Sequence, residues 1–114
     1  MILLHQDLNI EIWQSKPFLE KMANIGSEVF RANKWREINK NDADLAFFRS
    51  VELIDLTKAN RNLSEGEKFE LFRFKEYWCD YYLYNNIYNF TGKWFDDYFM
   101  WLTVYWKVMG TISN

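Results

Sequence analysis

Glycine and proline are scarce in this chain, and this scarcity constrains the fold more than any other feature of the sequence. The 114 residues include four Gly and one Pro. Because these residue types form most tight turns and interrupt regular structure, a chain with so few of them has little room for loops. Helices are on average longer than strands and leave fewer connections to build. The sequence therefore predicts an all-α fold made of a few long helices.

Hydrophobic residues recur at the three- and four-residue spacing of amphipathic helices over four segments. We expect helices over about residues 17–37, 42–59, 65–84 and 92–109. Asn41 is a candidate N-cap of the second helix, Ser64 and Glu67 form a capping box for the third, and Gly110 fits a stop after the fourth. Short connections make sequential helices antiparallel neighbours. The predicted fold is one domain, a four-helix up-down-up-down bundle.

Three further patterns concern packing. Hydrophobic and polar residues alternate over residues 8–12, and this period of two predicts an extended N-terminal arm over residues 1–14. Gly26 lies on the apolar stripe of the first helix, beside Phe30, which predicts that a second helix approaches closely there. In the third helix, the positions at helical spacing run through Phe69, Phe72, Glu76, Cys79 and Leu83.

Composition excludes several classes of protein. Hydrophobic residues make up 49% of the chain and aromatic residues 20%, which excludes intrinsic disorder. Cys79 is the only cysteine and His5 the only histidine, so an internal disulfide and a Cys/His zinc site are both excluded. The longest apolar run, residues 98–106, is too short to span a bilayer. We expect a cytoplasmic protein without a signal peptide, a cofactor or a membrane partner.

Acidic pairs suggest one catalytic alternative. Glu52 and Asp55 lie one helical turn apart, and so do Glu76 and Asp80. If the two pairs faced each other across the bundle, their oxygens could hold Mg²⁺ for hydrolysis of a phosphorylated small molecule, as in α-helical nucleoside-triphosphate pyrophosphohydrolases. Solvated acids and ion pairs with Lys or Arg are the other interpretation of the same spacing.

A second group of polar residues flanks the apolar stripe of the first helix. Glu28 and Arg31 lie three residues apart, and buried charges must satisfy one another. Asn24 and Arg73 could complete such a network, which would either form a polar pocket or fix helix register. The sequence favours the second interpretation.

Other enzyme classes fit poorly. A helical ribonuclease of the HEPN type pairs an arginine with a histidine a few residues downstream, whereas His5 precedes every predicted helix. Cys79 has no histidine in a segment that packs on it, so we expect it to be buried and inert. RNA binding stays open, since basic residues are frequent in the middle of the chain, but the net charge of −2 does not favour nucleic acid.

The fourth predicted helix has no polar face, which indicates a second buried surface besides the core. Trp94, Trp101 and Val108 lie seven residues apart on one stripe, which we expect to face a partner chain or the N-terminal arm. A broader stripe is expected to face the core: Phe95, Tyr98, Phe99, Leu102, Tyr105 and Met109.

Three groups of residues carry a resemblance to a known family. They are Trp13-Gln14 with residues 22–35, the segment ELIDLT at 52–57, and CDYY at 79–82. In this order they resemble a family of small uncharacterised prokaryotic proteins, over about residues 13–99, and the resemblance implies no role for any residue. The architecture alone is similar to four-helix proteins of ribosomal-RNA intervening sequences and to accessory proteins of diversity-generating retroelements.

Taken together, these patterns favour a non-catalytic helical bundle that binds a macromolecular partner, as a homo-oligomer or as a subunit beside another protein. The magnesium-dependent hydrolase and the RNA-associated accessory subunit are the two alternatives.

Overall fold

The computed structural model describes residues 9–113, except for the side chains at positions 103, 105–107 and 109–113. Five helices make up this region, and it contains no strand, which confirms the all-α fold class. In chain order they are α1 Ile10–Ser15, α2 Phe18–Trp35, α3 Lys40–Lys58, α4 Glu65–Leu83 and α5 Gly92–Ser113.

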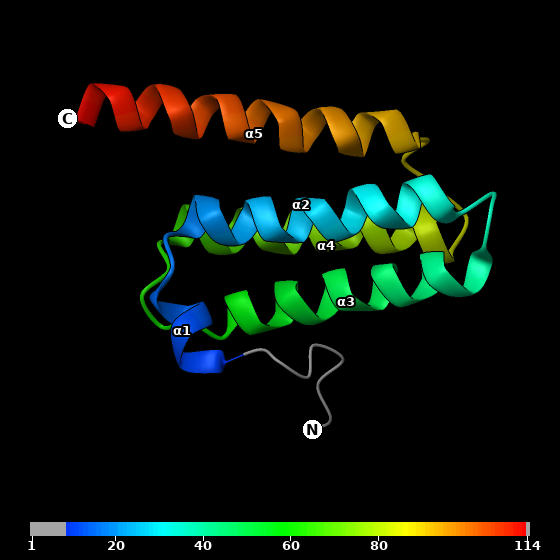
Figure 1. The fold of residues 1–114 in the computed structure, drawn as a ribbon, viewed down its shortest axis with the longest axis horizontal. Coiled ribbons are helices and arrows are strands. Elements are labelled where there is room, and N and C mark those ends of the chain that lie inside the picture. Colours follow the sequence, from blue (N-terminus) through cyan, green and yellow to red (C-terminus); the bar gives the residue numbers. More distant parts are fainter. Residues whose placement is uncertain (1–8, 114) are drawn as a thin grey trace.

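The four long helices lie side by side, with α2 and α4 between α3 and α5 (Figure 1). α2 packs along both α3 and α5. The Asn33 side chain of α2 donates to the Gly92 carbonyl at the start of α5, whereas Gly26 meets Phe99 further along α5, so these two helices run antiparallel. Contacts pair Asp44 with Tyr82 and Asp55 with Lys75, so α3 and α4 are antiparallel as well.

Two predicted helix caps differ from the structure. α3 begins at Lys40, and Asn39 rather than Asn41 is its N-cap, with the Asn39 Oδ1 accepting from the Asp42 amide at 3.3 Å. α5 does not stop at Gly110 but continues to Ser113. A glycine ends a helix where the backbone turns left-handed, and inside a helix it is tolerated at a cost of about 1 kcal/mol. The capping box of Ser64 and Glu67 is present at α4, as predicted.

The extended arm is wrong for residues 10–14, which belong to α1. Asn9 caps this helix, with its Oδ1 accepting from the Ile12 amide at 3.1 Å. The helical turn directs Trp13 into the core, where its indole N–H donates to the Thr57 hydroxyl at 3.2 Å. Gln14 donates to the Leu56 carbonyl at 2.6 Å. These contacts with α3 override the period-two pattern, and the rest of the arm, residues 1–8, lies outside the described residues.

Aromatic side chains fill the core between α3, α4 and α5. Trp78 of α4 is fully buried, and its indole N–H donates to the Ser50 hydroxyl of α3 at 2.8 Å. Phe47 stacks on Tyr82 with 4.3 Å between ring centroids. Phe74 meets Phe95 edge to face.

The buried side of α4 is not the stripe through Phe69 and Phe72. Phe69 and Phe72 are exposed, while Leu71, Phe74 and Trp78 are buried. Both stripes are apolar at helical spacing, so periodicity alone does not distinguish them. The stripe that is buried contains the larger side chains, and its Trp78 finds a hydrogen-bond partner in the core.

The expected close approach at Gly26 is confirmed. A Cβ atom at this position would come within 2.6 Å of the Phe99 ring of α5. Only glycine lets the α2 backbone lie directly on that ring.

Candidate functional site

The four acidic residues considered for a metal site are not gathered into one. The Asp55 carboxylate pairs with Lys75 Nζ at 2.7 Å on the exposed side of α3 and α4. Glu76 and Asp80 line a different hollow, together with Cys79 and Tyr88. Within the part of the chain that the structure describes, no group of three or more His, Cys, Asp or Glu side chains could hold a metal ion. The magnesium hypothesis therefore gains no support from the geometry of Glu52, Asp55, Glu76 and Asp80.

The polar network on α2 is smaller than expected. Arg31 donates to both carboxylate oxygens of Glu28, at 3.1 and 3.2 Å, and Glu28 is buried while Arg31 is half exposed. Asn24 is exposed and donates to the carbonyl of Glu20. Arg73 pairs with Glu70 on α4 at 2.8 Å. Asn24 and Arg73 thus each bond a residue of their own helix.

Cys79 is half-buried rather than fully buried. Burial raises the pKa of its thiol, an effect that nearby Lys75 partly opposes. The thiol, rather than the nucleophilic thiolate, is therefore the form present at neutral pH.

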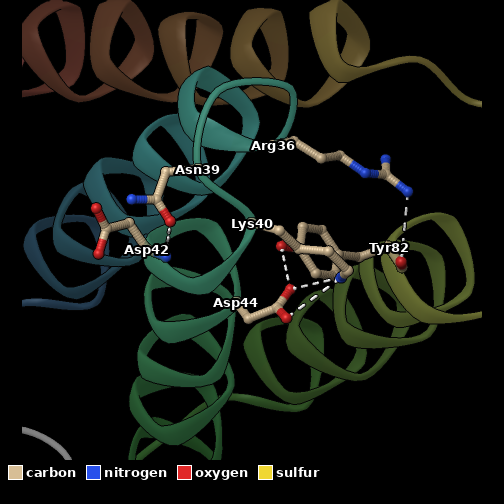
Figure 2. Close-up of polar contacts among 6 residues, drawn as sticks. All are labelled: Arg36, Asn39, Lys40, Asp42, Asp44 and Tyr82. Carbon is tan, nitrogen blue, oxygen red and sulfur yellow. Dashed lines mark hydrogen bonds and ion pairs between the residues drawn. The ribbon is translucent and has the colours of Figure 1, made fainter.

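A cluster of charged and aromatic residues joins α3 to the C-terminal part of α4 (Figure 2). The Tyr82 hydroxyl donates to Asp44 Oδ1 at 2.8 Å, and Lys40 Nζ donates to both Asp44 oxygens at 3.1 and 3.2 Å. The hydrogen bond from Tyr82 lowers the pKa of Asp44 most, and the bond from Lys40 lowers it further. The Arg36 guanidinium lies over the Tyr81 and Tyr82 rings, 4.7 and 4.9 Å from their centroids.

This cluster is suited to holding helices together. Burial, followed by the bond to Asp44, raises the pKa of Tyr82, so its hydroxyl stays a donor while Asp44 stays ionised. Neither group titrates near neutral pH, as a general acid or base would need to.

The outward side of α5 exposes large apolar side chains to solvent. Trp101 is 72% exposed and Met100 64%. Among the α5 residues whose side chains the structure describes, four are exposed and apolar, and we call them the α5 face: Met100, Trp101, Val104 and Val108. Phe95 and Phe99 are buried on the opposite side, as predicted. The side chains of Tyr105 and Met109, which were also expected in the core, are outside the described region. No described helix is long and apolar enough to cross a membrane.

Trp94 does not share the α5 face with Trp101 and Val108. Its ring stacks on Phe90 at 4.2 Å and on Tyr98 at 5.6 Å, and it is half-buried. Phe90 belongs to the connection before α5, so this connection covers the first turn of the predicted stripe. The heptad spacing of Trp94, Trp101 and Val108 contains no information about the contact between Trp94 and Phe90.

A groove lies beside the α5 face, between α2 and α5. Its volume is about 510 Å³, and Gly26 and Phe99 lie among its lining residues. Phe30 lines it from α2 and is 56% exposed, although the sequence placed this residue on the core stripe. Met100 belongs to both the groove and the α5 face. The sequence alone did not identify Phe30, Met100 and Val104 as surface residues. The feature that could have indicated them is that both helices carry more apolar residues than one buried side can hold.

The charged residues of the groove come from both helices. Arg31 and Lys34 line it from α2, and Asp96 lines it from α5. Burial raises the pKa of Asp96, an effect that the hydrogen bond from the Asn33 amide, at 3.2 Å, opposes. Lys34 Nζ lies 6.0 Å from the centre of the Trp35 ring.

Comparison of the chain with protein-family models, with curated proteins and with solved structures finds no match. The resemblance over residues 13–99 therefore stays a prediction.

Proposed function

We propose that this protein is a non-catalytic helical interaction protein that binds another protein chain, a second copy or a different subunit, through the α5 face. In this proposal α2 to α5 form a four-helix up-down-up-down bundle that presents the face on one side. The observation that carries it is the exposure of Trp101, flanked by Met100, Val104 and Val108.

Burial of apolar surface is the physical reason for this function. Each square ångström of apolar surface removed from water contributes about 25 cal/mol, so four neighbouring apolar side chains favour a contact that covers them. Trp and Met are also enriched in protein interfaces. Among the described residues no segment lies over this face, since α1 packs against α3 instead.

Site-specific photo-crosslinking in cells tests the proposal. A benzophenone amino acid replaces Trp101 in one variant and Phe69 in a control. Phe69 is a matched control because it is also an exposed aromatic residue, 63% exposed, but lies on α4. We expect a covalent adduct with a protein chain from position 101 and none from position 69, with mass spectrometry identifying the chain. Equal adducts from both positions, or none from position 101, would contradict the proposal.

A matched pair of substitutions tests the same face in the purified protein. Trp101→Glu places a charge in the centre of the contact and should weaken association by about 30-fold or more, because replacing a central interface Trp removes about 2 kcal/mol or more. Phe69→Glu should leave association unchanged. Light scattering measures the mass, and circular dichroism checks that both variants keep their helices.

A further inference from the structure

The α5 face and the groove between α2 and α5 form one continuous surface. Met100 belongs to both, and exposed Phe30 flanks the groove from α2. The face is a helix ridge that projects apolar side chains, and the groove is a hollow of about 510 Å³ next to it. A surface that carries a ridge and a hollow side by side can fit a rotated copy of itself.

The charges on this surface also match a copy of the same surface. Lys34 and Arg31, which also pairs with Glu28 of its own helix, come from α2, whereas Asp96, which accepts from Asn33, comes from α5. If the two-fold axis runs along α5, each α5 lies over the groove of the other copy and contacts both its α5 and its α2. The basic side chains of one copy then face the helix that carries the acidic side chain. A nucleic acid or a strongly acidic protein would match one of these signs and oppose the other.

The size of the surface is that of a stable interface. α5 has 22 residues, so it is about 33 Å long. With neighbouring helix axes about 8–10 Å apart, two helices present a face about 20 Å wide. The product, about 660 Å², lies at the lower end of the roughly 600–1,000 Å² that each partner contributes to a stable protein–protein interface.

We propose that the α5 face and the adjoining groove bind a second copy of this chain in a two-fold dimer, with α2 and α5 of both copies packed together across the axis. In such an interface the same patch serves both partners. Residues 101, 104 and 108 are three and four positions apart, which is the spacing of side chains along a helix–helix seam. This inference depends on the proposed function and narrows it to one partner.

Cysteine crosslinking tests the two-fold arrangement. With Cys79→Ser as background, single cysteines replace Met100, Trp101 or Val104 in turn, and mild oxidation follows. A two-fold axis that runs along α5 brings the two α5 helices together in register, so identical residues of the two copies meet and we expect a disulfide-linked dimer at one or more of these positions. Phe69→Cys and Phe72→Cys on α4 are matched controls and should stay monomeric on denaturing gels. Equal crosslinking at the α4 positions would overturn the inference.

The mass of the unmodified protein gives the second readout. Light scattering over a dilution series should show twice the chain mass, and Phe30→Glu should weaken the dimer by about 30-fold. A monomer at all concentrations overturns the second-copy inference. If such a monomer still gives a photo-adduct with a different protein from position 101, the proposed function stands. If position 101 reacts only with residues 1–8 of its own chain, the proposed function fails as well.

Discussion

At Gly26, the absence of a side chain decides how closely α2 and α5 pack. A Cβ atom there would lie 2.6 Å from two atoms of the buried Phe99 ring. Gly26→Ala should therefore lower the free energy of unfolding by up to about 2 kcal/mol, because overpacking costs about 1–3 kcal/mol and the helix preference of alanine offsets about 1 kcal/mol of it. Chemical denaturation measures the difference. Gly66→Ala is the control, since its Cβ would meet only Ser64 Oγ at 3.9 Å, and a similar loss there would contradict the argument.

Lys21 is a buried cation at the other end of α2. It is 1% exposed, and its Nζ donates to the carbonyl and the side-chain oxygen of Gln14, both at 3.3 Å. Burial lowers the pKa of Lys21 from 10.5, although the charge of Glu67 opposes this shift. A methionine of similar length removes the cost of burying this charge, and the Gln14 carbonyl keeps the Asn60 side-chain amide as a donor. We therefore expect Lys21→Met to be at least as stable as the wild type at neutral pH.

The pH dependence of this difference has a defined sign. Between the lowered pKa of the folded state and 10.5, the unfolded chain keeps the proton that folded Lys21 has lost, so raising the pH through this window stabilises the wild type. The advantage of Lys21→Met should thus shrink as the pH approaches 10.5. Denaturation of both proteins at several pH values measures it, and the tyrosines, common to both, cancel. An advantage that stays constant with pH would contradict the assignment.

At the scale of helices, the short α1 is held by its contacts with α3. Trp13 is buried and its indole N–H donates to Thr57, whereas Ile12 on the same helix is exposed. Trp13→Ala should lower the free energy of unfolding by about 3–5 kcal/mol, the range for truncating a core tryptophan. Ile12→Ala should change it by less than about 0.5 kcal/mol. Equal effects in urea denaturation would mean that α1 does not dock on α3.

The sequence was sufficient for the elements whose signals are local. Few Gly and Pro residues and a helical period predict the long helices, and the Ser64 capping box predicts the first residue of α4. Tertiary contacts decided the rest. The contacts of Trp13 with α3 accompany a helix where the sequence pattern predicts an extended segment. Ser50 accepts a hydrogen bond from the Trp78 indole, and α4 buries a different face from the one through Phe69.

The candidate surface was predictable only in part, for the same reason. An α5 helix without a polar side indicates that one apolar side is left outside the core, and Trp101 and Val108 are exposed there. Which neighbours join them depends on packing. Phe90 covers Trp94, and the approach at Gly26 leaves Phe30 on the edge of a groove. Spacing along one helix contains no information about either contact.

At the scale of the whole molecule, the net charge of −2 and the apolar α5 face predict how association responds to salt. Contacts between apolar side chains are not screened by ions, and the mixed charges of the groove contribute little at the exposed edge. We expect the dimer mass measured by light scattering to be the same in low and high salt. A mass that falls to that of the monomer as salt rises would show that ion pairs dominate the contact.

The RNA-associated alternative predicts a different salt response. A surface that neutralises about 6–10 phosphates loses roughly 10³–10⁵-fold in affinity between about 50 and 200 mM salt. Fluorescence anisotropy with a labelled single-stranded RNA therefore distinguishes the two functions. We expect no binding at low salt, because the groove sets Asp96 beside Arg31 and Lys34, and the chain as a whole is acidic. Binding at low salt that is lost steeply as salt rises, and lost in Lys34→Glu, would favour the RNA-associated function instead.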